Sequence, residues 1–443
     1  MADRLVAGLD LGSTGIKLLV ADEDGAELAL VETPTPWQPG PGGTAELPVD
    51  GLVAALHSLL HSAADRLEGR RVEALAVAGM GESGVLLDGA GRPAAPVFAW
   101  FDPRGAEQAR GFPAAIRAEF AGRTGLPLGA QASVAKLAFL RDGGLALAGH
   151  RWLDLPEFAA TVLGGRPSLE ASLVSRTGLI DQDTGEPWDA MLAELGATRD
   201  LLPPIEPAGT DLGAVFDRFP AAFAGARITV AGHDHLVAAE AGGGLGPDRY
   251  HVSIGTAEVL LRVLDAPLGY AARARLAEHL INEVRHVVPG KHVLVAGVKT
   301  GLLLRRALRA FGITDRAGRD RLDAAVMGLP FEGALPEGGL DVSGARNDDG
   351  DLVLTVRTDG ATPAEVFGAV LRHSNEEIRR LVAAIDREVP PATSATLTGG
   401  WAGMRSVRRA RERVLPDPTV SERSQETAFG AALVAARLLP APA

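Results

Sequence analysis

The sequence predicts an α/β protein built from two similar halves that face each other across a cleft. Its 443 residues are too many for one ordinary core and suggest two domains of roughly 200 residues each. Its 54 glycines and 29 prolines fall between apolar runs, where they mark the ends of many strands and helices. Residues 8–20, GLDLGSTGIKLLV, have a shorter echo in residues 251–263, HVSIGTAEVLLRV, and each copy reads as strand, glycine turn and strand.

The first half begins with an antiparallel meander, in which strands at 5–11 and 16–21 are joined by a turn of small residues and followed by a second turn at 22–25. The patterns beyond it predict an amphipathic helix at 50–67, a strand at 72–78, a loop at 79–84, strands at 85–87 and 96–100, a buried strand at 228–231 and a helix at 236–241.

The second half repeats this plan after a glycine cluster, Gly242-Gly243-Gly244, so we place the domain boundary near residue 245. Its expected elements are the echo itself, a strand at 292–296, a helix at 302–311, a long helix at 363–388, a strand at 395–397 and a closing helix at 425–439.

Charge and composition exclude several classes of protein. The chain has 44 basic and 56 acidic residues and a net charge of -12, which disfavours a nucleic-acid partner. It has no cysteine, hence no disulfide and no cysteine-ligated zinc, which suits a reducing cytosol. Charges near the start and the lack of an apolar run of ~18 residues predict neither a secretory signal nor a membrane span. We therefore expect a cytoplasmic protein without a membrane partner.

The first turn, residues 10–17 with the sequence DLGSTGIK, has the composition of a phosphate-binding loop. Its glycines let backbone N–H groups approach phosphate oxygens, and Ser13, Thr14 and Lys17 add hydroxyl donors and a positive charge. Lysine occurs only at positions 17, 136, 291 and 299. Asp10, at the end of the strand, is a carboxylate that can hold a hydrated magnesium ion. An ordinary hairpin with a polar turn is the alternative for this segment taken alone.

Two further glycine segments suggest a nucleotide site. Residues 253–256, SIGT, repeat the first turn, so two loops from two lobes can grip a polyphosphate between them. Residues 397–402, LTGGWA, follow a strand and would let a flat nucleoside lie against the backbone near a helix N-terminus. A plain strand-to-helix turn is the alternative, and the arginines at 405–413 are typical of a solvated helix face. Residues 297–300, GVKT, lack the glycine of a P-loop before the lysine but can still line a nucleotide pocket.

The centre of the chain carries a candidate general base. The strand at 228–231 runs into the sequence AGHDH at 231–235. Asp234, a carboxylate at a strand end between two lobes, can take a proton from a hydroxyl as it attacks phosphorus. A His-Asp-His metal cluster is disfavoured because adjacent side chains on a strand point to opposite faces. An aspartate that caps the following helix is the other alternative.

Candidate substrate residues lie at 79–83, GMGES, and at 100–104, WFDPR. Glu82 and Asp102 can accept paired hydrogen bonds from neighbouring hydroxyls of a polyol, and the indole of Trp100 suits the apolar face of a sugar. For each of them, a loop charge or a buried tryptophan is the alternative.

In this order, the segments resemble the FGGY carbohydrate kinases, members of the actin, hexokinase and Hsp70-like fold group. GLDLGSTGIKLLV resembles the family's first phosphate motif, SIGTAEVLL its second, LTGGWAG its adenosine-side motif, and AGHDH the segment with its catalytic aspartate. Residues 76–105 resemble the sugar-side block, with Trp100, Asp102 and Arg104 at its W-x-D-x-R positions, and residues 175–196 resemble a further family segment. The long helix carries His373-Ser374-Asn375 where the family usually has a Glu-Gly pair.

The resemblance implies two ribonuclease H-like domains of the actin-like ATPase type around a central cleft, at 1–244 and 245–443. It implies ATP and Mg²⁺ as cofactors, Asp234 as base and Asp10 as magnesium partner. The residues expected around the nucleotide are Gly12, Ser13, Thr14, Lys17, Gly255, Thr256, Gly301, Gly399 and Gly400. Those expected around the sugar are Glu82, Trp100, Asp102, Arg104 and His235.

We therefore expect an ATP-dependent kinase of a small sugar or polyol, with a homodimer as the candidate assembly. A pentulose or related ketose is the first candidate substrate. Glycerol or a tetritol is the second, because Glu82 stands where the family's glycerol kinases have Glu and its xylulose kinases have His. A non-catalytic sugar sensor is the rival function, and the retention of Asp10, Lys17 and Asp234 argues against it. The block at 79–104 argues against an actin-like assembly protein or a chaperone ATPase.

Overall fold

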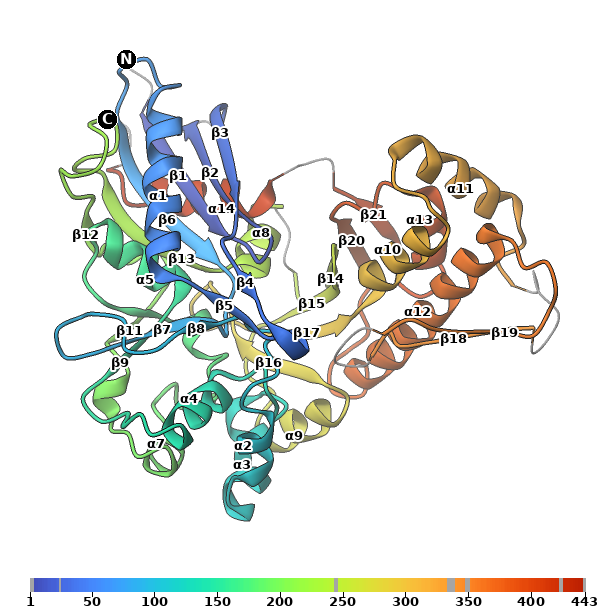
Figure 1. The fold of residues 1–443 in the computed structure, drawn as a ribbon, viewed down its shortest axis with the longest axis horizontal. Coiled ribbons are helices and arrows are strands. Elements are labelled where there is room, and N and C mark those ends of the chain that lie inside the picture. The colour runs from blue at the N-terminus through green and yellow to red at the C-terminus, as the bar shows by residue number, and fades with distance from the viewer. Residues whose placement is uncertain are drawn as a thin grey trace.

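The computed structural model describes residues 4–23, 25–242, 246–332, 339–346, 351–421 and 425–440. Two six-stranded sheets organise these residues, one in the blue and green part of the chain and one in the yellow and red part (Figure 1). Helices pack on both sheets, so the predicted α/β class with two lobes is confirmed. No helix in the described part of the chain combines the length and apolar character needed to cross a bilayer.

The first sheet combines an antiparallel meander with three parallel strands. Its strands lie in the order β12 (Gly213–Ala214), β13 (Arg227–His233), β6 (Val72–Gly79), β1 (Leu5–Leu11), β2 (Gly15–Asp22) and β3 (Glu27–Pro34). β1, β2 and β3 are antiparallel neighbours, whereas β1, β6 and β13 run parallel. β1 and β6 are buried almost throughout, as expected for central strands with both faces covered. The sequence prediction did not include β3.

The second sheet repeats the hairpin and its parallel neighbour. Its strands lie in the order β16 (Ile281–Arg285), β17 (His292–Val298), β15 (Glu258–Leu264), β14 (Arg249–Ile254), β20 (Ser394–Thr398) and β21 (Pro418–Val420). β14 pairs antiparallel with β15 and parallel with β20, as β1 does with β2 and β6. The internal repeat in the sequence therefore corresponds to a repeat in strand pairing.

Helices cover both sheets. On the first sheet, α1 (Val49–Ala64) lies on one face, while α8 (Asp234–Ala241) and α14 (Glu426–Ala436) pack together on the other (Figure 1). The second lobe carries α10 (Thr300–Ala310), α11 (Arg316–Gly328), α12 (Pro363–Ile385) and α13 (Arg405–Arg411). The remaining helices are α2 (Ala106–Gly111), α3 (Ala114–Thr124), α4 (Ser133–Asp142), α5 (Leu155–Leu163), α6 (Ala171–Val174), α7 (Asp189–Glu194) and α9 (Tyr270–Glu278).

Short strands lie outside the two large sheets. They are β4 (Gln38–Pro39), β5 (Ala45–Leu47), β7 (Gly84–Leu87), β8 (Val97–Phe98), β9 (Arg151–Asp154), β10 (Leu169–Glu170), β11 (Ile205–Glu206), β18 (Leu340–Ser343) and β19 (Val353–Val356). They form one three-stranded sheet, β4-β5-β8, and three two-stranded sheets, β7-β9, β10-β11 and β18-β19. Two 3₁₀ turns occur at Pro41–Gly43 and Arg199–Leu201.

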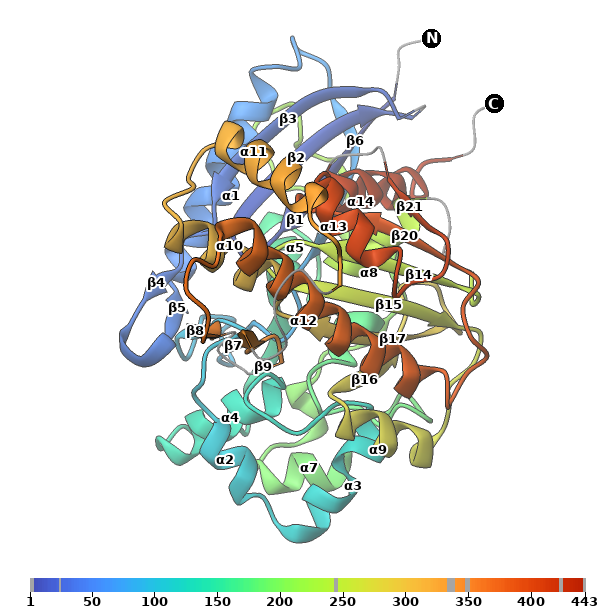
Figure 2. The same cartoon turned by 90° about the vertical axis from the view of Figure 1, so that its right-hand side faces the viewer.

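The two lobes share a packed base. Alternate residues of β15, such as Val259 and Leu261, belong to the core of the first lobe, while Leu260 belongs to that of the second. Below the second sheet, α9 packs against α3 (Figure 2), and Arg273 Nε donates to the carbonyl of Gly122 at 2.6 Å. The lobes are thus joined by buried apolar and polar contacts on one side.

The closing helix departs from the predicted division of the chain. The predicted boundary, 244/245, lies outside the described residues, and the division into 1–244 and 245–443 stays a prediction. However, α14 packs on β1, β6 and α8 of the first lobe. A Cβ atom at Gly8 would lie 1.9 Å from the carbonyl oxygen of Ala428, which shows how closely helix and strand approach. The last helix is therefore an exception to a second domain that runs to the end of the chain.

Candidate active site

Two carboxylates lie at one edge of the first sheet because of its parallel strands. Asp10 on β1 pairs in register with Ala78 of β6, and His233 on β13 pairs with Gly79 of the same strand. The carboxyl ends of β1, β6 and β13 therefore meet at a single edge. Asp234 directly follows β13, so Asp10 and Asp234 lie on either side of β6 at that edge.

Asp234 is the first residue of α8, where the helix N-terminus favours a negative charge. Its Oδ1 accepts a hydrogen bond from the backbone N–H of His235 at 2.6 Å and lies 3.1 Å from Nδ1 of His233. Burial acts to raise the pKa of Asp234, but the two histidines and this hydrogen bond outweigh it and hold the pKa below its ordinary value. Asp234 is therefore ionised at neutral pH and can accept a proton.

Asp10 has the opposite tendency. Burial, followed by the charge of Asp234, raises the pKa of Asp10 from 3.8 to about 7, and Lys17 opposes this rise. Its Oδ1 is buried without a hydrogen-bond partner. Two acidic groups and an unpartnered oxygen suit a hard divalent cation, because magnesium prefers oxygen ligands and is usually held by one or two carboxylates plus substrate phosphates. In the described ranges no three or more acidic or histidine side chains gather into a metal site.

The first glycine turn is held rigid by two tryptophans. The backbone N–H of Gly12 donates to the carbonyl of Gly15 at 3.1 Å. Trp37 Nε1 donates to the carbonyl of Ser13, and Trp100 Nε1 donates to its hydroxyl, both at 2.9 Å. The Ser13 side chain is thus already partly engaged, whereas Thr14 is exposed at the tip of the turn.

The second glycine turn forms a closely packed corner with the third glycine segment. Gly399 has a φ of +87°, and a Cβ atom there would lie 2.6 Å from the carbonyl oxygen of Ile254. A Cβ at Gly301 would lie 1.7 Å from the carbonyl oxygen of Gly255. Gly301 is therefore buried beneath the turn, and only glycine fits at these positions.

Thr256 and Gly400 are exposed on this corner. The carbonyl of Thr256 accepts a hydrogen bond from the backbone N–H of Leu302 at 2.8 Å, which docks α10 on the turn. A bound molecule can therefore reach Thr256 and Gly400, as well as Gly399, which is also exposed.

Glu82 forms an ion pair that sequence reasoning missed. Its backbone has a φ of +63°, and its Oε1 lies 2.6 Å from both Nε and a terminal nitrogen of Arg176. The side chains of Glu82 and Arg176 are only 13% and 10% exposed. Arg176 lies in the segment 175–196, which resembles a further segment of the family. A buried guanidinium therefore faces the predicted sugar side.

Asp102 and Arg104 pair with each other and with groups of β5. Asp102 is fully buried, and its oxygens accept hydrogen bonds from the backbone N–H of Ala45 and from Arg104. Arg104 stacks over the ring of Phe98 at 4.1 Å and also pairs with Glu46. These partners join β5 and β8 through the two side chains, and the expected role of Asp102 and Arg104 beside a substrate stays a prediction.

Trp100 and His235 lie near the edge of the first sheet that carries Asp10 and Asp234. Trp100 contacts Ser13, as described above, and the ammonium of Lys299 lies 5.5 Å from the centre of its ring. The ring of His235 lies 5.6 Å from that of His233, next to Asp234. Lys17 is paired in register with Asp10 on the adjacent strand. Predicted residues of the first half thus gather near the end of its hairpin, and Lys299 of the second half contacts them through Trp100.

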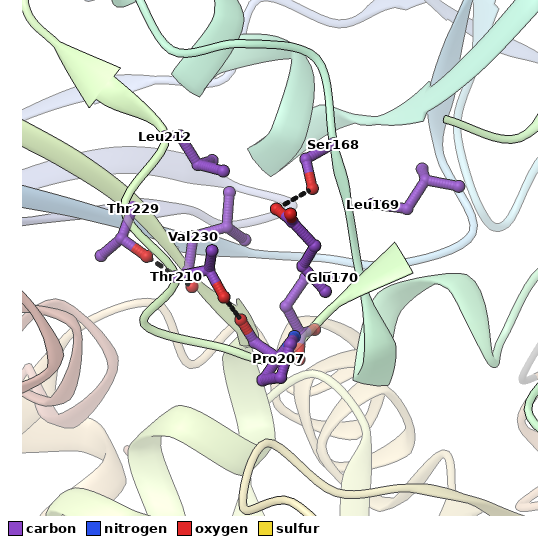
Figure 3. Close-up of a pocket in the computed structure, with 9 residues that line it drawn as sticks. Ser168, Leu169, Glu170, Pro207, Thr210, Leu212, Thr229 and Val230 are labelled. Carbon is purple, nitrogen blue, oxygen red and sulfur yellow. Dashed lines mark hydrogen bonds between the residues drawn. The ribbon is translucent and has the colours of Figure 1, made fainter. Parts of the chain in front are cut away.

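A small pocket lies behind β13, away from the glycine turns, and none of the predicted site residues lines it. Figure 3 shows the hydroxyl of Thr210 directed at Pro207, and that of Ser168 directed at a carboxylate, which belongs to Glu206. Glu170, also in the wall, accepts a hydrogen bond from Ser172, whose hydroxyl oxygen accepts the backbone N–H of His233 at 3.1 Å. This layer holds the strand end that precedes Asp234.

Comparisons with known proteins agree with this architecture. Residues 5–240 match the model of the N-terminal domain of the FGGY family of carbohydrate kinases. A xylulose kinase of Streptomyces coelicolor is 27% identical over 98% of this chain and 88% of its own length. The crystal structure of a xylulose kinase from Rhodospirillum rubrum superimposes with a TM-score of 0.80 at 21% identity, covering 98% of this chain and 90% of that one. A Plasmodium falciparum glycerol kinase with ADP gives a TM-score of 0.82 at 15% identity, covering 98% and 89%. The chain therefore belongs to the FGGY family of carbohydrate kinases.

Proposed function

We propose that this carbohydrate kinase transfers the terminal phosphoryl group of ATP to a hydroxyl group of a ketose such as a pentulose, with Asp234 as the general base. The observation that carries the proposal is the position of Asp10 and Asp234 at one sheet edge, beside the first glycine turn. The similarity to a xylulose kinase over nearly the whole chain supports a ketose as the substrate class.

The mechanism follows from the charges of these two carboxylates. Asp234 is ionised and accepts the proton of the attacking hydroxyl, so the oxygen gains nucleophilic character as it approaches phosphorus. The backbone N–H of His235 and the N-terminus of α8 hold this carboxylate in place. Because phosphoryl transfer depends mainly on positioning and charge neutralisation, the exposed Thr14 and Thr256 and the ammonium of Lys17 would bind the phosphates.

The residues present also suit the expected metal. Asp10, with its unpartnered Oδ1, would hold magnesium together with the phosphates. When bound, the ion neutralises phosphate charge and would keep Asp10 ionised, against the effect of burial.

A glycerol or tetritol kinase is the second candidate. Glu82 supports it, because a glutamate at this place can accept hydrogen bonds from a short polyol. The structural similarity to a glycerol kinase with ADP is consistent with it. However, Arg176 already engages one oxygen of Glu82, so a polyol has to share that carboxylate.

We further propose that the protein is cytoplasmic and forms a homodimer. Light scattering on the purified protein would test the dimer.

The function is tested by measuring ADP release with ATP, Mg²⁺ and a panel of ketoses, glycerol and tetritols. We expect a pentulose or related ketose to raise ADP release most. ADP release that stays at background with every acceptor would contradict the kinase proposal and favour a sugar sensor.

The base is tested by Asp234→Asn, which keeps the size of the side chain but removes its proton-accepting charge. We expect turnover to fall at least ~100-fold while ADP affinity changes little. The matched control is Asp217→Asn at an exposed position, which should leave turnover unchanged. Near-normal turnover of Asp234→Asn would remove Asp234 from this role.

A further inference from the structure

Lys299 lies at the junction of the two lobes. It follows β17 directly and precedes the first residue of α10, so it belongs to the second lobe. Its ammonium nevertheless lies 5.5 Å from the centre of the Trp100 ring, which belongs to the first lobe. The side chain is half-buried. The side chain of Lys299 therefore reaches from the second lobe to the first.

Both ends of this contact are fixed to a glycine turn. On the first lobe, Trp100 donates a hydrogen bond to the hydroxyl of Ser13. On the second lobe, α10 is docked on the second turn by the hydrogen bond from Leu302 to the carbonyl of Thr256 and by the close approach of Gly301 to Gly255. The backbone of Lys299 is also fixed, because its N–H donates to the carbonyl of Ala345 at 2.8 Å. The ammonium is thus held where the two turns face each other.

The negative charges at this edge of the first sheet favour a second cation besides magnesium. Asp10 and Asp234 lie at the same edge of the first sheet, so two acidic side chains already lie where the phosphates would bind. A triphosphate brought to this edge adds several negative charges, and a cation that reaches across from the second lobe would neutralise part of the charge on its terminal group. A lysine has a flexible stem and three donors, so its ammonium can move a few Å from an aromatic ring to a phosphate. A phosphate would offer this ammonium a charged hydrogen bond, which is among the strong hydrogen bonds in proteins.

We propose that Lys299 is a phosphate-binding residue of the kinase reaction, whose ammonium leaves Trp100 for the terminal phosphate of ATP. This inference rests on the proposed function. Lys299 then contributes to the affinity for the terminal phosphate and to neutralisation of the group in transfer. The Trp100 ring holds the cation at the cleft before the nucleotide enters.

Lys299→Met tests the inference, with Lys291→Met as the matched control. The two lysines lie immediately after and immediately before β17, and Lys291 pairs with Asp265 at 3.3 Å at the far end of that strand. Calorimetry would measure the binding of ADP and of a non-hydrolysable β,γ-imido analogue of ATP, both with Mg²⁺. We expect Lys299→Met to weaken the analogue at least ~10-fold and ADP less than ~3-fold, whereas Lys291→Met changes neither.

The outcomes separate the explanations. Equal weakening of ADP and the analogue would mean that Lys299 only holds the lobes together, and no change in either would also overturn the proposal. If circular dichroism shows that Lys299→Met does not fold, Lys299→Arg replaces it. In that case, a Lys299→Arg variant that binds the analogue more tightly than ADP to the same degree as the wild type supports the inference. Because binding needs no sugar, a wild-type protein that binds the analogue but turns over no acceptor refutes the proposed function without refuting this one.

Discussion

At the scale of single residues, Asp10 and Asp234 show how one sheet edge produces two kinds of carboxylate. Both are shielded from water, and burial alone would raise the pKa of each. Asp234 has two histidines, a backbone donor and a helix N-terminus around it, so its charge is stabilised. Asp10 has an unpartnered oxygen and a like charge nearby, so its charge is costly until a cation arrives.

Asp10 should therefore destabilise the empty protein at neutral pH. Its pKa is about 7 in the folded protein and 3.8 without the fold, so between these values the folded state binds more protons. Stability is lost as the pH rises through this window, by roughly 4 kcal/mol at most. We expect Asp10→Asn to raise the melting temperature of the empty protein more at about pH 8 than at about pH 5, while turnover falls. Calorimetry of both proteins at both pH values checks this. An Asp10→Asn variant that melts below the wild type at about pH 8 would contradict the prediction.

The sequence indicates these residues because their signals are local. A glycine turn after an apolar strand, or an aspartate between a strand and a helix, can be recognised from neighbours in the chain. The partners of Asp102, Arg104 and Glu82 come from distant segments, so sequence alone could not separate a ligand-facing carboxylate from one that a guanidinium already occupies. Arg176 was missed for the same reason, since its role depends on Glu82, far away in the chain.

At the scale of elements, α13 illustrates a basic helix that is not simply solvated. Its arginines at 405–413 read as an exposed face, yet Arg411 is fully buried. Two of its nitrogens lie 2.6 Å from the two carboxylate oxygens of Glu258 on β15, which is also fully buried. Arg411 also donates to Ser374 and Asn375 of α12. The departure from the family pattern at 373–375 thus supplies polar partners that link α12, α13 and β15.

We expect Arg411→Met to lower the free energy of unfolding by about 3–5 kcal/mol, because it leaves the charge of Glu258 buried without a partner. The double variant Glu258→Met, Arg411→Met should be less destabilised than the single one, since no unpaired charge remains. Arg405→Met, at an exposed position of the same helix, is the control. Urea denaturation measures all three, and equal stability of Arg411→Met and Arg405→Met would show that the pair contributes little.

At the scale of the whole molecule, the fold contains an internal repeat of strand pairing, but the helix α14 does not follow it, because it packs on the first lobe. The two hairpins with their parallel neighbours, and the order of the larger elements, could be read from apolar periodicity and glycine turns. The edge strand β3, the short paired strands and the place of α14 could not, because they depend on which surface of the folded chain still needs a cover. α14 finds that surface on β1 and β6, beside α8.

The contact between β1 and α14 should be sensitive to one added methyl group. Gly8→Ala would place a Cβ atom 1.9 Å from the carbonyl oxygen of Ala428, so the helix has to move away from the strand. We expect faster hydrogen exchange of β1 amides while those of β20 stay protected. Gly111→Ala, at a position with no atom within 4 Å, is the control and should change neither. Loss of protection confined to β20 would be inconsistent with this docking.

The docking of α14 also sets an order of events during synthesis. β1 leaves the ribosome long before α14, so the core of the N-terminal lobe is not closed until the residues of the second lobe have been synthesised. Until then one apolar face of its central strands is bare and offers a binding surface to chaperones. A ribosome that stalls before residue 426 therefore releases a chain in which the lobe that carries Asp10 is incomplete. We expect this truncated chain to lack kinase activity.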